Sequence, residues 1–202
     1  MNDEKDVQII KRHKICYMYN FIIVLKTQNF YFMKRIIITL VFVGIATVGF
    51  SQKKMQPEWQ DFSKAINATD QNKITMVYVY NTPCNLCTTT EETILADTTV
   101  INTLKKNFIA TKFYSDTKED VIVKGKTFPY MPSSETSGVN MYAIILLGGK
   151  MGFPTFVFLD KDGEKIGTHF PVNTTAEFLL ILQYYSSGDY KNAPYEEWIK
   201  KQ

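Results

Sequence analysis

The clearest pattern in the chain is a short apolar run that ends in a turn and two cysteines. Residues 74–80 (ITMVYVY) are β-branched, aromatic or otherwise apolar, which predicts a short buried strand. The turn Asn81-Thr82-Pro83 predicts a helix that Thr82 caps and that begins at Pro83. Cys84 then lies in the first helical turn. A competing helix start at Thr88 or Thr89, each three residues before a glutamate, would leave both cysteines in a loop.

The remaining pattern predicts helices and strands in alternation. Helical spacing of apolar residues predicts helices near 57–67, 100–107, 141–147, 174–185 and 194–200. Strands are predicted at 108–114, at 155–159 and at 164–168, with Asp160–Gly163 as the hairpin turn between the last two. Residues 115–140 are polar and rich in glycine and proline, which predicts an irregular excursion with one short strand at 121–123. This order predicts an α/β sandwich whose mixed central sheet is flanked by helices, with a C-terminal β-hairpin and a closing helix.

The N-terminal region has the pattern of a secretory signal peptide. A short basic start, Met33-Lys34-Arg35, precedes about fifteen apolar residues and then small or polar ones, so we expect residues 33–51 to direct export and to be cleaved after Ser51. A retained membrane anchor is the alternative, although the apolar run is shorter than the ~20 residues that a spanning helix needs. We interpret residues 1–32 as an upstream over-extension or an unstructured lead, and residues 52–202 as one domain.

The charge balance argues against a nucleic-acid partner. The whole chain carries +3, but residues 1–51 hold seven Lys/Arg and three Asp/Glu, which leaves sixteen basic and seventeen acidic residues after them. A nearly neutral domain has no basic face for phosphates. Removing the first segment also removes Cys16 and His13, so Cys84, Cys87 and His169 are the thiols and imidazole of the mature chain.

Two cysteines with two residues between them, at a helix start, favour reversible disulfide chemistry. Backbone N–H groups and the helix dipole stabilise a thiolate there. One alternative is an inert disulfide in a binding or folding module, but so short a loop constrains little chain entropy. Another is a copper or other metal site with His169 as a third ligand, although structural zinc sites use four ligands. We predict neither a metal nor a cofactor.

Three motifs together give the chain its resemblance to a known family. Cys84-Asn85-Leu86-Cys87 follows a core strand, Phe153-Pro154-Thr155 opens a later one, and Lys161-Asp162-Gly163 forms a hairpin. Over residues 57–185 the chain resembles thioredoxin-fold proteins. Residues 140–154 are similar to exported bacterial members with a longer central insertion, which here spans about 115–150. The resemblance implies a thioredoxin-like sandwich, a cis peptide bond before Pro154, and a substrate chain that pairs with the backbone of Phe153.

The resemblance also implies a function. We expect a monomeric, periplasmic thiol–disulfide oxidoreductase in which Cys84 attacks and Cys87 resolves, with protein thiols or disulfides as substrates and an electron donor or acceptor in the membrane. The chain departs from the family pattern in having Pro83 before the first cysteine and Asn85-Leu86 between the two. Tyr78 stands where many members have a buried aspartate as proton acceptor, so water or Glu91, one helical turn beyond Cys87, is the candidate for that role. The direction of electron flow stays open.

Overall fold

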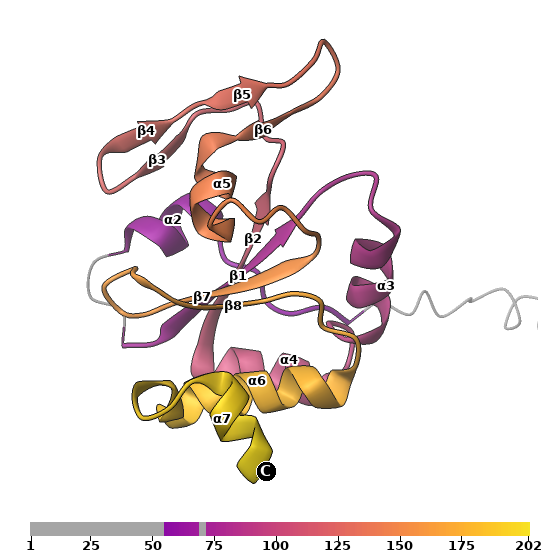
Figure 1. The fold of residues 1–202 in the computed structure, drawn as a ribbon, viewed down its shortest axis with the longest axis vertical. Coiled ribbons are helices and arrows are strands. Elements are labelled where there is room, and N and C mark those ends of the chain that lie inside the picture. Colours follow the sequence, from indigo (N-terminus) through magenta and orange to yellow (C-terminus); the bar gives the residue numbers. More distant parts are fainter. Residues whose placement is uncertain (1–54, 69–71) are drawn as a thin grey trace, which may run out of the picture. The chain divides into compact units, whose positions relative to one another are not determined.

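A four-stranded mixed sheet forms the centre of the molecule (Figure 1). The computed structural model describes residues 55–68 and 72–202, so the predictions for residues 1–32 and for the signal segment 33–51 lie outside the described residues. Strands β1 (Ile74–Tyr80) and β2 (Phe108–Tyr114) are parallel, and β7 (Thr155–Leu159) and β8 (Lys165–His169) are antiparallel to their neighbours, in the order β2-β1-β7-β8. The predicted α/β sandwich is confirmed.

Helices cover both faces of this sheet. Successive side chains of β1 point to opposite faces, and the apolar side chains on each face are buried against helices. Val77 and Val79 pack with α2 (Phe62–Asn67) and α5 (Met141–Leu147). Met76 and Tyr78 point to the other face, which is covered by α4 (Thr98–Asn107) and α6 (Thr175–Ser187). Helix α3 (Asn85–Thr93) lies at the end of the sheet where β1 stops (Figure 1).

The C-terminal segment packs against the body. It consists of the 3-10 turn η1 (Asp189–Lys191), α7 (Tyr195–Trp198) and the 3-10 turn η2 (Ile199–Lys201). Trp198 is buried, and the Tyr184 hydroxyl of α6 donates to the Ala193 carbonyl at 2.6 Å. The aromatic residues of this segment therefore extend the hydrophobic cluster that contains the buried side chains of α6.

The excursion is more ordered than its sequence predicts. The short strand at 121–123 is confirmed, but the excursion contains two hairpins, β3 (Val121–Val123) with β4 (Lys126–Phe128) and β5 (Tyr130–Pro132) with β6 (Gly138–Asn140). The buried Asn140 organises them, because its side-chain amide donates to the carbonyls of Glu119 and Phe128 and its backbone N–H donates to Ser115. These partners are distant in sequence, so no local pattern reveals them.

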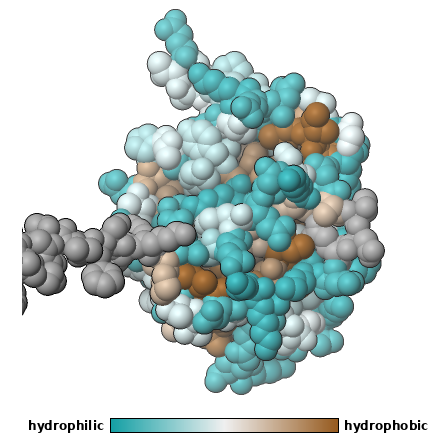
Figure 2. Space-filling view, turned by 180° about the vertical axis from the view of Figure 1, so that it is seen from behind, coloured by the Kyte–Doolittle hydropathy of each residue, from teal (hydrophilic) through white to brown (hydrophobic). Residues whose placement is uncertain are grey.

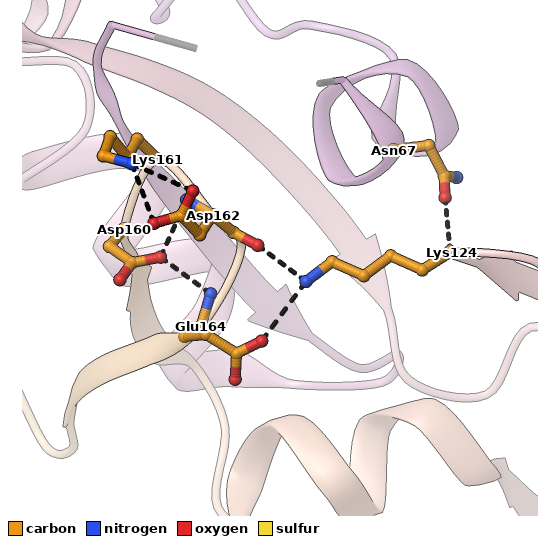
Figure 3. Close-up of polar contacts among 6 residues, drawn as sticks. All are labelled: Asn67, Lys124, Asp160, Lys161, Asp162 and Glu164. Carbon is orange, nitrogen blue, oxygen red and sulfur yellow. Dashed lines mark hydrogen bonds and ion pairs between the residues drawn. The ribbon is translucent and has the colours of Figure 1, made fainter. Parts of the chain in front are cut away.

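A second polar junction fixes the β3–β4 hairpin to the body (Figure 3). Lys124 has a φ of +48°, and its backbone N–H donates to the Asn67 side-chain oxygen at 2.7 Å. Its ammonium bonds the Asp162 carbonyl at 2.6 Å and the Glu164 carboxylate at 3.2 Å. The Asp160 carboxylate accepts from the N–H groups of Asp162 and Glu164, which closes the predicted hairpin turn. The junction therefore joins α2, the insertion and the β7–β8 turn.

Side-chain caps explain where the predicted boundaries shift. Helix α4 begins at Thr98 rather than at 100 because the Asp97 carboxylate accepts the N–H groups of Thr99 and Val100. Thr174 caps α6 as predicted, and Gly148, with a φ of +62°, ends α5. Within the described part of the chain, none of the helices has the length and apolar character needed to cross a membrane.

Candidate functional site

The two cysteines form a disulfide directly after β1, with their Cα atoms 5.2 Å apart. Their exposure differs: Cys84 is partly exposed, whereas Cys87 is 5% exposed and belongs to the core side of α3. A reagent in solution therefore reaches the sulfur of Cys84 much more readily than that of Cys87. This asymmetry is the geometric basis for distinct roles of the two thiols.

The predicted start of the helix is wrong by two residues. Cys84, and not Thr82, is the N-cap of α3: its backbone is extended (φ −149°, ψ 100°), and its sulfur accepts the Cys87 N–H at 3.0 Å. Pro83 therefore precedes the helix. The cap matters for chemistry, since a helical N–H group points at the Cys84 sulfur and, with the helix dipole, favours its thiolate form.

The alternative start at Thr88 or Thr89 is also wrong. Both threonines lie inside α3, where their hydroxyls donate back to the carbonyls of Cys84 at 3.3 Å and Asn85 at 3.1 Å. Such bonds satisfy a threonine side chain within a helix without breaking the backbone ladder. The capping boxes seen in the sequence are therefore not used.

Tyr78 forms a hydrogen bond with the first turn of α3. Its side chain is fully buried, and its hydroxyl donates to the Cys87 carbonyl at 3.2 Å. Burial, with a smaller contribution from the Glu91 charge, raises the pKa of this phenol far above its ordinary value. Tyr78 therefore stays protonated and acts as a hydrogen-bond donor, in contrast to the buried aspartate that many thioredoxins have at this position.

A partly buried ion pair lies on the same side of the sheet. The Lys112 ammonium is 2.9 Å from the Glu91 carboxylate, with side chains 24% and 26% exposed. The ammonium also lies over three rings, at 4.8 Å from the centroid of Trp59, 5.7 Å from that of Tyr78 and 5.8 Å from that of Tyr80. Sequence reasoning selected Glu91 and missed Lys112. The pairing of β1 with β2, which sets Tyr78 opposite Lys112, is the signal that could have found it.

The Phe153-Pro154 motif lies at the same end of the sheet. The peptide bond before Pro154 is cis, which confirms the expectation, and those before Pro83 and Pro171 are cis as well. Val79 pairs with Thr155 in an antiparallel register, so Pro154 lies next to Tyr80, the last residue of β1. The cysteine turn follows Tyr80 immediately. The role of the Phe153 backbone in pairing with substrate remains a prediction.

Phe170 is a neighbour of this motif that sequence reasoning missed. Its ring is 50% exposed although it is apolar, and a Cβ added to Gly152 would lie 2.7 Å from it. Glycine at position 152 therefore lets the ring rest on the backbone just before Phe153. No short sequence motif marks this contact, since it joins the segment before β7 to the segment after β8.

His169 lies on the edge strand of the central sheet. It is the half-buried last residue of β8, and its Nε2 lies 2.9 Å from the Tyr185 hydroxyl. Burial lowers the pKa of its imidazole to about 4. Among residues 55–68 and 72–202, no three His, Cys, Asp or Glu side chains are placed to hold a metal ion.

Comparisons with known proteins gave one family match and several similar structures. The model of the thioredoxin-like domain matches residues 62–186. A thioredoxin from Thermus thermophilus, solved in solution, is 24% identical, with a TM-score of 0.47 over 65% of this chain and 88% of its own. A thioredoxin-fold protein from Helicobacter pylori is 14% identical (TM-score 0.49, 69% and 88% covered), and the oxidoreductase DsbH is 15% identical (TM-score 0.41, 62% and 81%). No curated protein matches the chain.

Proposed function

The chain belongs to the thioredoxin-like family, and from this premise we propose that it is a thiol–disulfide oxidoreductase whose substrates are cysteines of other proteins. The observation that carries the proposal is the disulfide at the start of α3, with Cys84 partly exposed and Cys87 buried. An accessible thiolate at a helix start is a nucleophile that forms a mixed disulfide with the substrate. A buried partner thiol next to it resolves this mixed disulfide.

In the reducing direction, the Cys84 thiolate attacks one sulfur of a substrate disulfide. A bond forms between Cys84 and that sulfur while the substrate disulfide breaks, and the leaving thiolate takes up a proton from water. The Cys87 thiol then loses its proton and attacks the Cys84 sulfur, which releases the second substrate thiolate and restores the Cys84–Cys87 bond. The substrate gains two electrons and the chain loses them. The oxidising direction is the reverse of the same steps.

We propose that Glu91 accepts the proton of the Cys87 thiol, directly or through a water molecule. Tyr78 is unsuited to accept it because burial raises the pKa of its hydroxyl. Lys112 holds the Glu91 carboxylate at 2.9 Å and so fixes its position. Glu91 therefore assists the resolving step by accepting the Cys87 proton, while the helix start assists the attacking step by stabilising the Cys84 thiolate.

The substrate's chain would run in extended form past the backbone of Phe153, beside the cis proline. This assignment follows the resemblance to the family and is supported by the position of Pro154 at the same end of the sheet as the cysteines. We further infer that the protein works as a monomer in the periplasm and exchanges electrons with a membrane partner. The signal-like segment 33–51 supports export.

Trapping experiments test the roles of the two cysteines. A Cys87→Ser variant should accumulate mixed disulfides with its protein partners, visible as bands that disappear on reduction, because the resolving thiol is gone. The matched Cys84→Ser variant should accumulate none. Equal trapping by both variants, or by neither, would contradict the assignment.

Two further measurements address direction and location. Equilibration of residues 52–202 with glutathione gives the redox potential of the Cys84–Cys87 pair. A value far below the redox potential of the cell envelope indicates a reductase that receives electrons from a membrane donor, and a high value indicates an oxidase or isomerase. A chain that does not cycle supports the inert disulfide instead. N-terminal sequencing of the exported protein should find Gln52 first, and a mature terminus upstream of Met33 would contradict the proposed processing.

A further inference from the structure

Strand β8 leaves one edge of the central sheet without a partner. It is the last strand in the order β2-β1-β7-β8, and within residues 55–68 and 72–202 no strand pairs with its outer edge. The opposite edge is partly occupied, because Gln60 bridges to Thr111 on β2 and its N–H donates to the Ala110 carbonyl at 2.8 Å. An open edge presents unpaired N–H and C=O groups to any extended chain.

A hollow of about 500 Å³ lies directly beside this open edge. The edge residues 166–169 form one wall, and the C-terminal segment and the end of α6 form the other, with four tyrosines at positions 184, 185, 190 and 195. The Tyr195 ring meets the His169 ring at 4.8 Å. Most of this second wall comes from residues after 186, where the match to the family model ends. The hollow is therefore an addition to the common fold.

The walls of the hollow are fixed by packing. A Cβ at Gly167 would overlap the Tyr185 hydroxyl, so glycine at this edge position makes room for the bond between Tyr185 and His169. The Tyr185 ring in turn stacks on Phe158 of the core with 4.0 Å between centroids. The hollow is thus a formed feature and needs no rearrangement to accept a side chain.

The charges around the hollow favour a cation. Glu196 lines it. Burial is the main cause that raises the pKa of Tyr184 and Tyr195, and nearby carboxylates add to it: Glu196 and Asp189 for Tyr184, and Glu177 and Glu196 for Tyr195. Lys191, whose ammonium lies 5.6 Å from the centroid of Tyr190, is the opposing charge. His169 is neutral at neutral pH because burial lowers its pKa to about 4. Aromatic walls with an excess of carboxylates suit the side chain of a lysine or arginine.

We propose that the open edge of β8 and this hollow form an accessory docking site for an extended basic segment of the polypeptide substrate. The segment adds a strand to β8 and places a lysine or arginine side chain between the tyrosines, next to Glu196. Strand β8 runs on into Phe170 and Pro171, at the end of the sheet that carries the cysteine turn, so a docked segment leads toward Cys84. That the segment belongs to a substrate rests on the proposed oxidoreductase function.

Direct binding of cysteine-free probes tests the site apart from its redox chemistry. The probes are a short peptide that alternates lysine and threonine, its glutamate counterpart, and a lysine version N-methylated at every amide. The lysine peptide should bind residues 52–202, measured by calorimetry and by the fluorescence of Trp198, which packs on Tyr195 and Tyr184. The glutamate peptide should not bind, and the N-methylated one, unable to donate hydrogen bonds, should bind at least about fivefold more weakly.

A matched pair of variants locates the binding. Glu196→Gln should weaken binding of the lysine peptide about threefold, as expected for an exposed ion pair, whereas Glu197→Gln, which removes a charge outside the hollow, should leave it unchanged. Turnover of a small disulfide such as cystine should be the same in both variants. Equal effects of the two substitutions, or equal binding of the N-methylated peptide, would overturn the proposal.

The remaining outcomes separate this site from the proposed function. A Cys84→Ser/Cys87→Ser variant should bind the lysine peptide like the wild type, so a chain that binds the peptide but does not cycle would overturn only the oxidoreductase function. Sedimentation of the chain alone tests whether the edge pairs with a second copy. Dimers that the lysine peptide dissociates would show that the edge serves self-association, which would overturn docking of a substrate.

Discussion

Replacement of Lys112 by methionine should destabilise the protein measurably. Methionine keeps most of the apolar stem that lies over Trp59, Tyr78 and Tyr80, so the packing changes little. What is lost is the ammonium, and with it the partner of Glu91 at 2.9 Å. The substitution therefore isolates the charge of Lys112.

The magnitude follows from the distance and the exposure of the pair. Two unit charges 2.9 Å apart attract by about 1.4 kcal/mol in bulk-water dielectric, and by more as burial lowers the dielectric. Desolvation and ordering of the side chains offset part of this. The contact with the rings adds about 0.5–1 kcal/mol. We expect Lys112→Met to lower the free energy of unfolding by about 2 kcal/mol, or Tm by roughly 4–8 °C.

Urea denaturation of residues 52–202 in the disulfide form measures this loss, with an unchanged m-value as the sign that the unfolded state is the same. A double-mutant cycle with Glu91→Gln should give a coupling energy of about 1 kcal/mol at low salt. Lys105→Met is the matched control: its ion pair with Glu58 is exposed, so it should cost less than about 0.5 kcal/mol. If Lys112→Met lowered the free energy of unfolding by no more than Lys105→Met does, or if the coupling energy with Glu91→Gln were zero, the assigned role of the Lys112 charge would be wrong.

Three further predictions concern the core beneath the site and the wall of β8. Tyr78→Phe should lower the free energy of unfolding by about 1 kcal/mol in urea denaturation, because the ring stays and the bond to the Cys87 carbonyl is lost. As pH falls from about 6.5 to about 4, the wild type should lose stability faster than His169→Gln, since its unfolded state binds a proton that the folded state rejects, with a difference in slope of at most about 1.4 kcal/mol per pH unit. Gly167→Ala should cost about 2 kcal/mol in the same assay and displace the Tyr185 ring, seen as a shift of its NMR signals.

Each of these has an outcome that would contradict it. A Tyr78→Phe variant as stable as the wild type would show that the Cys87 carbonyl is fully satisfied without the hydroxyl. Parallel pH curves for the wild type and His169→Gln would show that the imidazole takes up its proton in the folded state as readily as in the unfolded one. Unchanged Tyr185 signals in Gly167→Ala would place that ring away from β8.

The strands and long helices follow from local pattern, and for that reason the sequence predicts them well. Residues 74–80 read as a buried strand because both faces of the sheet are covered, which removes charged residues from every position. Thr174 and the glycine at 148 mark helix ends through bonds and dihedral angles set within a few residues. Such features need no knowledge of distant segments.

What the sequence did not predict depends on contacts between distant segments or on an unusual cap. Cysteine is uncommon as an N-cap, so the threonine-proline pair was the stronger local signal, and the sulfur's bond to the Cys87 N–H overrode it. Lys112 becomes part of the site only through the pairing of β1 with β2. The second hairpin of the insertion depends on the side-chain bonds of Asn140 to carbonyls up to 21 positions away.

The junction at Lys124 has a consequence for how the sequence can vary over evolutionary time. Most of its partners are main-chain atoms: the Asn67 side chain binds the Ile122 carbonyl and the Lys124 N–H, and the Lys124 ammonium binds the Asp162 carbonyl. Main-chain atoms are the same whatever the side chain. Mutations can therefore accumulate along the β3–β4 hairpin and in the β7–β8 turn while an amide at position 67 and a long cationic side chain at position 124 keep the segments joined. Homologues with unrelated insertion sequences should still share these two positions.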